Sequence, residues 1–228
     1  MSVHTRTPTE TAAVLFDLDG TLIDTKALYL EAYRRAVEPY VRQELTREDI
    51  MALRPTSELS FIRAVVAEPD VEVCVEDFYR AYRELHADRF HGVYPGVVTL
   101  LESIRADGLH LGLVTGKSRR SWEITREVVG DLGPFDSLVF DDDVRAPKPD
   151  PHGLELALDH LGVEPDAAVY VGDTRSDMEA ARAAGLRPMA ALWAHGPEDR
   201  ARHVERVSGL GAVPLHRPED LIPALKLD

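Results

Sequence analysis

Short apolar runs alternate with helical stretches along most of the chain after Pro95. Together with an earlier run, the segments predicted as strands are 12–16, 110–114, 137–140, 167–171 and 188–193, and a short strand and helix close the chain. These strands are too apolar to leave either face in water. Buried strands that alternate with helices are typical of a parallel sheet covered by helices on both sides, so the pattern predicts an α/β fold.

Residues 25 to about 94 differ, because they show helical periodicity without a convincing strand. Apolar positions recur there at three- and four-residue steps, as in Leu30, Tyr33, Val37 and Tyr40, and again in Val75, Phe78, Tyr82 and Leu85. We therefore expect a small all-helical cap domain at residues 25–92, inserted after the first strand. Residues 1–24 and 93–228 would form the core domain. Both connections fall beside the end of the first strand, which suits a lid.

Composition narrows the classes of protein that fit. The 228 residues are 44% hydrophobic, which is enough to bury a sizeable core. Forty acidic residues against 26 basic ones give a formal charge of -14, which disfavours nucleic acid and anionic membranes as partners. Cys74 is the only cysteine, so neither an intrachain disulfide nor a multi-cysteine metal site can form. Its apolar neighbours predict a small core residue.

Targeting signals are not evident. The first ten residues are polar, and the apolar run after them is too short for the central region of a signal peptide. No run approaches the ~18 apolar residues that a membrane span needs. We expect a cytoplasmic protein, a monomer or a homodimer, whose partner is a small molecule.

The chemistry is concentrated where the first predicted strand ends, in Asp17-Leu18-Asp19-Gly20-Thr21. Open α/β sheets carry their ligands at the carboxyl ends of their strands. Two carboxylates so close together, beside a glycine that permits an unusual turn, are costly unless a cation lies between them. Magnesium and a phosphate ester would meet that need.

Four short motifs follow one another along the chain, and their order is more specific than any one of them. They are 17–21, continuing to Thr25; 114–116; Lys148 within 146–151; and 172–177. Each motif alone is a weak signal, but together they are specific. The sequence resembles the haloacid dehalogenase-like hydrolases over nearly its whole length, in the capped phosphatase branch that includes phosphoglycolate phosphatases. The resemblance implies a Rossmann-like, doubly wound core and a helical cap.

Two aspartates and a metal can transfer a phosphoryl group, and the resemblance assigns the same roles. Asp17 would attack phosphorus and form an aspartyl phosphate. Asp19 would give a proton to the leaving alkoxide and later take one from water. Mg²⁺ prefers hard oxygen ligands, which suits Asp17, the main-chain carbonyl of Asp19 and Asp173. Asp177 would hold the metal's waters or the lysine in place.

Three more residues would bind the phosphate. Thr115 offers a hydroxyl, Gly116 lets the main chain come close, and Lys148 brings a cation to the nucleophile. Each also has a structural alternative. Thr115 could cap a helix, although Ser118 is better placed for that; Lys148 could belong to a surface turn; and Asp177 could be a first-turn acid favoured by the helix dipole.

Sibling chemistries differ at identifiable positions. Dehalogenases of the superfamily have an aromatic residue, and phosphonate-cleaving members a small one, where Asp19 stands. Mutases of the capped branch usually carry a histidine where Tyr29 stands, which weakens the mutase interpretation. We interpret 141–143, three aspartates, as a solvated acidic loop. The nine histidines show no metal-ligand spacing and are interpreted as surface or packing residues.

Substrate choice is expected to depend on the cap. The segment 54–58 lies between two predicted helices, and we hypothesise that Arg54 reaches the distal end of the substrate, since its guanidinium suits a carboxylate or second phosphate. The alternative is an exposed arginine at a helix end. Trp193, just past a core strand, is interpreted as packing.

The sequence therefore predicts a Mg²⁺-dependent phosphatase for a small phosphorylated metabolite, with phosphoglycolate as the leading candidate. An inorganic pyrophosphatase, a nucleotide or sugar-phosphate phosphatase and a sugar-phosphate mutase are alternatives. A degenerate family member that only binds ligands would have lost the nucleophile, a metal ligand or the lysine, and none is lost.

Overall fold

The sheet occupies the centre of the molecule. A computed structural model describes residues 10–41, 45–46, 49–50, 53 and 57–226. Its sheet has six parallel strands in the order β3-β2-β1-β4-β5-β6, which confirms the doubly wound core that the resemblance implies. The strands are β1 (Ala13–Phe16), β2 (His110–Val114), β3 (Ser137–Val139), β4 (Ala168–Gly172), β5 (Arg187–Ala191) and β6 (Val213–Leu215).

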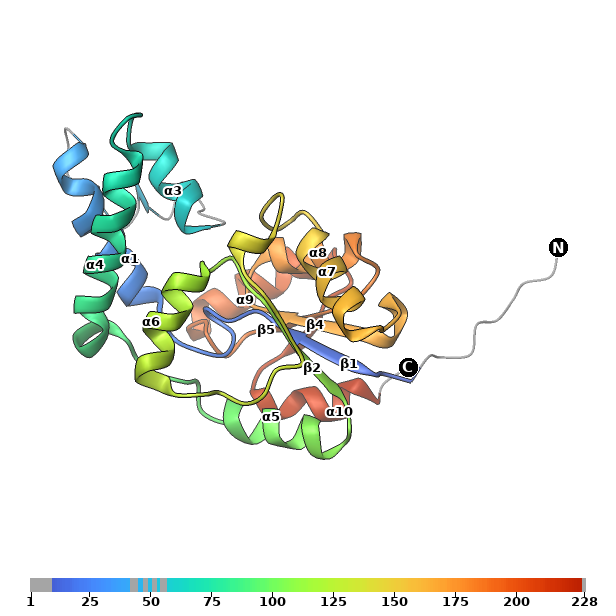
Figure 1. Cartoon of the computed structure of the whole chain (residues 1–228). Helices are drawn as coiled ribbons and strands as arrows, with labels where there is room; N and C mark the ends of the chain where they lie inside the picture. The colour runs from blue at the N-terminus through green and yellow to red at the C-terminus, as the bar shows by residue number, and fades with distance from the viewer. Residues whose placement is uncertain (1–9, 42–44, 47–48, 51–52, 54–56, 227–228) are drawn as a thin grey trace.

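Both faces of the sheet are covered, because alternate residues of each strand point to opposite sides. In β1, Val14 and Phe16 join the hydrophobic cluster formed with α5, α6 and α10. Ala13 and Leu15 join the cluster formed with α7 and α8. Figure 1 shows α5 and α10 on one side of the sheet and α7 and α8 on the other. The core helices are α5 (Val97–Ala106), α6 (Arg119–Val129), α7 (His152–Leu161), α8 (Arg175–Ala183), α9 (Pro197–Ser208) and α10 (Leu221–Leu225).

Short helical turns complete the core. They precede strands or helices and keep the connections close to the sheet. These 3-10 turns are η2 (Asp141–Asp143), η3 (Pro165–Ala167) and η4 (Pro218–Asp220).

A helical segment between β1 and α5 lies to one side of the sheet (Figure 1). We call its elements the cap: α1 (Lys26–Val37), η1 (Glu38–Tyr40), α3 (Glu58–Val65) and α4 (Val71–Arg89). The predicted apolar stripes pack together, with Tyr33, Val37, Phe78, Tyr82 and Leu85 in one buried cluster of their own. Cys74 is fully buried in the same cluster, as the sequence predicts.

The cap meets the core at two places. Its two connections to the sheet run side by side: Asp24 N–H donates to Gly92 O at 2.9 Å, and Tyr94 N–H donates to Leu22 O at 3.0 Å. Its longest helix, α4, packs along α6 of the core. Ile124 of α6 belongs to the cap's hydrophobic cluster, so α6 contributes to both sides of the junction.

None of the helices in the described part of the chain is both long and apolar enough to cross a membrane.

Candidate active site

The loop after β1 can form only with glycine at its turn. Gly20 has a φ of 82°, a left-handed conformation that side chains disfavour. A Cβ at this position would also lie 2.5 Å from Oδ2 of Asp173, which is a clash. Gly20 therefore turns the chain back and makes room for a carboxylate from another strand. This turn keeps Asp17 and Asp19 at the end of the sheet.

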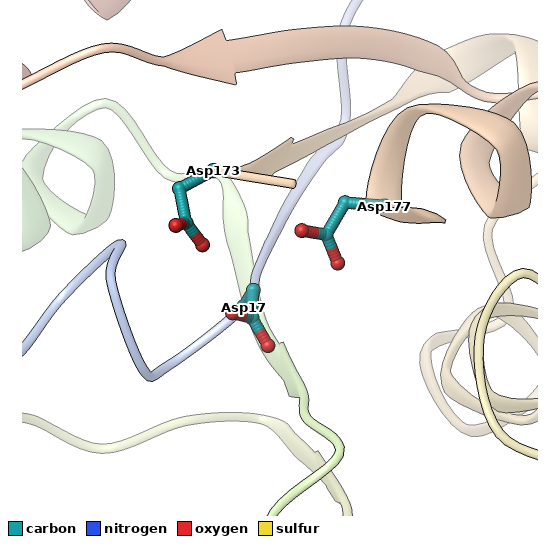
Figure 2. A group of neighbouring side chains, drawn as sticks. All are labelled: Asp17, Asp173 and Asp177. Atoms are coloured by element: carbon teal, nitrogen blue, oxygen red, sulfur yellow. The ribbon is translucent and has the colours of Figure 1, made fainter. Parts of the chain in front are cut away.

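Three carboxylates from separate segments converge there. Asp17 follows β1, Asp173 follows β4, and Asp177 lies in the first turn of α8 (Figure 2). One oxygen from each lies within 4.8 Å of the others. Asp17 is 5% exposed, and Oδ1 of Asp173 is buried without a hydrogen-bond partner among the described residues. A buried carboxylate oxygen without a partner, beside two further carboxylates, suits a hard divalent cation such as Mg²⁺.

A lysine whose side chain is 13% exposed lies among the carboxylates. Nζ of Lys148 donates to Asp17 Oδ1 at 2.7 Å, to Asp177 Oδ1 at 2.5 Å and to the Tyr170 hydroxyl at 2.9 Å. The Tyr170 hydroxyl in turn donates to Val114 O at 2.7 Å. Three acceptors satisfy the three N–H bonds of the ammonium. The structure therefore places Lys148 beside the predicted nucleophile rather than in a free surface turn.

Asp177 holds that lysine and also begins α8. Its Oδ2 accepts hydrogen bonds from Thr174 N at 2.9 Å and Thr174 Oγ1, while Thr174 Oγ1 accepts from Asp177 N at 3.2 Å. This is a capping box at the helix N-terminus. Asp177 is thus a first-turn acid of its helix, which was the structural alternative, and it also contacts Lys148. Gly172 is required here too, since a Cβ would lie 2.5 Å from Cβ of Asp177.

The crowding of charges shifts the protonation equilibria. Burial raises the pKa of Asp17 to about 7, with Lys148 opposing that shift and Asp177 adding to it. Burial and the neighbouring carboxylates also raise the pKa of Asp173 well above its ordinary value. Burial opposes the charge of Lys148, but Asp17 and Asp177 raise the pKa of its ammonium well above the usual range. A bound cation would favour the ionised forms of the acids.

Thr115 and Gly116, which follow β2, line a cavity of about 210 Å³ together with Asp17, Asp19 and Lys148. Ser118 caps α6, because its Oγ accepts from Ser121 N at 3.1 Å. Ser118, and not Thr115, is therefore the N-cap of α6, so the structural alternative for Thr115 does not apply. Thr115 Oγ1 accepts from Lys117 N at 3.2 Å.

Comparison with known proteins identifies the family. Residues 14–191 match the family described as haloacid dehalogenase-like hydrolase. The chain belongs to this family. It is therefore a hydrolase, and the resemblance inferred from the four motifs is confirmed.

Relatives of this haloacid dehalogenase-like hydrolase carry several names. The chain is 34% identical to pyrophosphatase PpaX of Bacillus velezensis over 181 residues, 79% of this chain and 83% of that protein. It is 33% identical to the phosphorylated carbohydrates phosphatase of Thermotoga maritima over 222 residues, 94% and 98% of the two chains. The crystal structure of CbbY from Rhodobacter sphaeroides in complex with phosphate is similar, with a TM-score of 0.79 and 25% identity, covering 95% of this chain and all of that one.

The sequence analysis missed a second lysine in this hydrolase. Lys117 has a side chain with no exposed surface, and its Nζ lies 3.1 Å from Oδ1 and 3.3 Å from Oδ2 of Asp19. Nζ also donates to the hydroxyls of Tyr29 at 2.6 Å and Tyr82 at 2.7 Å. Its place two residues after Thr115, at the end of a core strand, is the signal that could have indicated a role at the site.

No feature of the sequence indicates a role at the site for Tyr29 and Tyr82 of the cap. Tyr29 and Tyr82 fit the apolar stripe of a helix, and nothing in the stripe shows where their hydroxyls point. The Tyr29 hydroxyl donates to Glu58 Oε1 at 2.6 Å, and Glu58 is buried at the start of α3. Burial raises the pKa of Glu58, with Lys117 opposing that shift.

Three further residues contact the loops of the site. The Thr25 hydroxyl donates to Asp19 Oδ1 at 2.6 Å. His195 Nε2 lies 3.1 Å from the main-chain oxygen of Asp173, so this histidine contacts the loop that follows β4. Trp193 Nε1 donates to Thr21 O at 2.8 Å and packs against the core cluster, as predicted.

Two sequence hypotheses have different outcomes. Asp142 and Asp143 are exposed and bind Arg119 at the start of α6, which agrees with a solvated loop. Arg54 lies outside the described residues, so its hypothesis remains a prediction. Two residues of the surrounding segment, Ile50 and Ser57, line the cavity.

Proposed function

We propose that this chain is a Mg²⁺-dependent phosphatase that hydrolyses a small phosphorylated metabolite through an aspartyl-phosphate intermediate. The observation that carries the proposal is the position of Asp17: its carboxylate faces the cavity, Lys148 is 2.7 Å away, and Asp173 converges on it. The Lys148 ammonium, together with a bound divalent cation, would offset the charges of the carboxylates and of the phosphate, so that Asp17 could attack a phosphate dianion.

The chain's own groups can account for both halves of the reaction. An oxygen of Asp17 forms a bond to phosphorus while the bond from phosphorus to the leaving oxygen breaks, and Asp19 protonates that oxygen. Asp19 then accepts a proton from the water that attacks the aspartyl phosphate, which restores Asp17 and releases phosphate. Lys148 holds Asp17 and brings its positive charge close to the phosphate, while Thr115 and the main chain at Gly116 offer donors to the phosphate oxygens.

Mg²⁺ would be held by Asp17, Asp173 and the main-chain carbonyl of Asp19, with Asp177 supporting the site through Lys148. When bound, it would offset the negative charge of the phosphate and of the carboxylates around it.

The cavity supports a small organic leaving group. Its volume of about 210 Å³ is below the ~300 Å³ at which pockets for drug-sized ligands begin. Leu30, Tyr33 and Ile50 of the cap are among the residues that line it. Apolar walls suit the carbon atoms of an ester, and the similarity to pyrophosphatase PpaX keeps pyrophosphate as the alternative substrate. Phosphoglycolate and small sugar phosphates both meet this description, and a relative's name includes phosphorylated carbohydrates.

A panel of phosphorylated metabolites tests the proposal. Phosphoglycolate, sugar phosphates, nucleotides and pyrophosphate would be assayed for phosphate release with Mg²⁺ and with a chelator. We expect Mg²⁺-dependent release from one or more esters, and none from Asp17→Asn. Release that survives chelation, or that persists in Asp17→Asn, would refute the mechanism. Activation by a sugar bisphosphate with little net phosphate release would indicate a mutase.

Arg54→Ala tests the hypothesis on specificity. If the guanidinium binds the distal end of an acidic substrate, KM for phosphoglycolate should rise far more than KM for an aryl phosphate. Equal changes in the two KM values would exclude that contact.

A further inference from the structure

The proposed function gives Asp19 two proton transfers, so the groups that orient its carboxylate matter for the rate. In the structure both Asp19 oxygens lie near one cation, the Lys117 ammonium, at 3.1 and 3.3 Å. Lys117 comes from the strand end that also supplies Thr115, and its side chain has no exposed surface. A lysine buried to this degree needs partners for each N–H bond.

Those partners leave Lys117 no free donor. Nζ has three N–H bonds, and it lies among the hydroxyls of Tyr29 and Tyr82 and the two oxygens of Asp19. The ammonium also lies 4.4 Å and 4.8 Å from the ring centroids of the two tyrosines. Lys117 is therefore engaged with protein groups rather than available as a free cation for the phosphate.

The partners come from different parts of the fold. Asp19 follows β1 of the core, whereas Tyr29 belongs to α1 and Tyr82 to α4 of the cap. Tyr29 in turn donates to Glu58 at the start of α3. Three cap helices thus contribute to one hydrogen-bonded chain that ends on a carboxylate of the core.

We propose that Lys117 is a positioning residue for Asp19, and that Tyr29 and Tyr82 make this position depend on the docked cap. Lys117 holds the carboxylate where it can exchange a proton with the leaving group or water. The two tyrosine hydroxyls hold the ammonium toward Asp19. Proton transfer is therefore fast when the cap lies against the core, while attack by Asp17, which is held by Lys148, does not require this chain of contacts.

Leaving-group chemistry separates the two steps. The nitrophenolate of an aryl phosphate such as 4-nitrophenyl phosphate departs without taking up a proton. The first step with this substrate therefore needs Asp17 but not Asp19. Hydrolysis of the aspartyl phosphate still needs Asp19 as the base. In a rapid-mixing experiment, the initial burst of nitrophenol measures the attack of Asp17 on phosphorus. The slower steady rate measures hydrolysis of the aspartyl phosphate, for which Asp19 is the base.

Lys117→Met is the first variant. We expect a nitrophenol burst of nearly one per site at a rate within about threefold of the unmodified enzyme, followed by a steady rate reduced about tenfold or more. The kcat for the best alkyl phosphate should fall by a similar factor. Asp19→Asn and the double variant Asp19→Asn with Lys117→Met should have equal rates, because Lys117 acts through Asp19.

Tyr29→Phe combined with Tyr82→Phe is the second variant, and it keeps Lys117 and the aromatic packing. We expect the same pattern with a smaller reduction of the steady rate. Tyr79→Phe is the matched control, since Tyr79 lies on the same helix and donates to Ser118 Oγ at 3.1 Å without touching Lys117. It should leave both phases unchanged.

Several outcomes would overturn the proposal. These are an equal loss of burst rate and steady rate in Lys117→Met, a further tenfold loss when Lys117→Met is added to Asp19→Asn, or equal effects of Tyr79→Phe and the tyrosine pair. Thermal melting would show whether Lys117→Met is folded, and the double tyrosine variant tests the idea if it is not. Failure of the proposed function looks different, because the unmodified chain would then show no Mg²⁺-dependent burst at all.

Discussion

Two lysines of the site, Lys117 and Lys148, invite comparison, because each forms an ion pair with an aspartate of the same loop. Lys148 binds Asp17, together with Asp177 and Tyr170. Every one of those partners belongs to the sheet or to the first turn of α8. Lys117 binds Asp19 with two tyrosines that belong to the cap.

The two groups differ in the parts of the fold that they require. The Lys148 group needs only the core, because the ends of β1 and β4 are neighbours in the sheet and Asp177 lies at the start of α8. The Lys117 group needs the core and a separate hydrophobic cluster to meet. The proposed nucleophile, Asp17, is thus held by the core alone, and the proposed proton-transfer residue, Asp19, by the contact between core and cap. Changes at Lys148 and at the cap junction should therefore have different consequences.

The largest expected effect is at the nucleophile. Asp17→Asn keeps the shape of the side chain but removes the attacking oxygen anion, so phosphate release should fall about 10⁴-fold or more. The assay is steady-state phosphate release with Mg²⁺, and circular dichroism checks that the variant is folded. Residual activity within tenfold of the unmodified enzyme would contradict the assignment of the nucleophile.

Lys148→Met comes next, because it leaves Asp17 and Asp177 facing each other without the ammonium. We expect kcat to fall about 10³-fold. Without Mg²⁺ the free energy of unfolding should also fall by about 3 kcal/mol, since buried carboxylates lose their partner. Urea unfolding in chelator measures the second effect. A stability equal to that of the unmodified chain would show that the carboxylates do not depend on Lys148.

Mg²⁺ binding should depend on pH at the core site. With the pKa of Asp17 at about 7 and that of Asp173 raised, the ion must displace protons below neutrality. Affinity should therefore rise with pH between about 6 and 8, by up to tenfold per pH unit for each proton displaced. Isothermal titration calorimetry in buffers of different ionisation enthalpy measures both affinity and proton release.

The same shift determines how the metal-free protein responds to pH. Asp17 keeps its proton up to about 7 in the folded state but loses it near 3.8 when unfolded. The folded state therefore binds more protons between these values, and its contribution to stability falls as pH rises through that window. A Mg²⁺ affinity that does not change with pH would refute both expectations.

The smallest effect is expected at the exposed part of the cap junction. Arg120 and Glu76 form an ion pair at 2.5 Å, but their side chains are 51% and 58% exposed. Glu76→Gln should change the free energy of unfolding by less than about 1 kcal/mol and should not alter the burst or the steady rate. A large kinetic effect would mean that surface charge, rather than the buried contacts of Lys117, controls the docked cap.

The strands and the principal site residues could be predicted because their signals are local. Apolar runs define buried strands, Asp17 and Asp173 follow two of them, and Lys148 stands between these acids in the order of the four motifs. Boundaries were less accurate, since the strand predicted at 188–193 ends at Ala191 while Leu192 is still fully buried. Burial continues past the last paired residue, so hydrophobicity alone does not mark where pairing stops.

The sequence by itself determined the α/β pattern, the helical insertion and the acids that meet at the sheet edge, because parallel strands bring their carboxyl ends to one line. Only the tertiary structure decided that Lys117 lies against Asp19 and that Tyr29 and Tyr82 turn their hydroxyls toward it. A tyrosine in an apolar stripe satisfies the same helical pattern whichever way its hydroxyl points. Its direction depends on which surface of another segment packs beside it, and no local pattern contains that information.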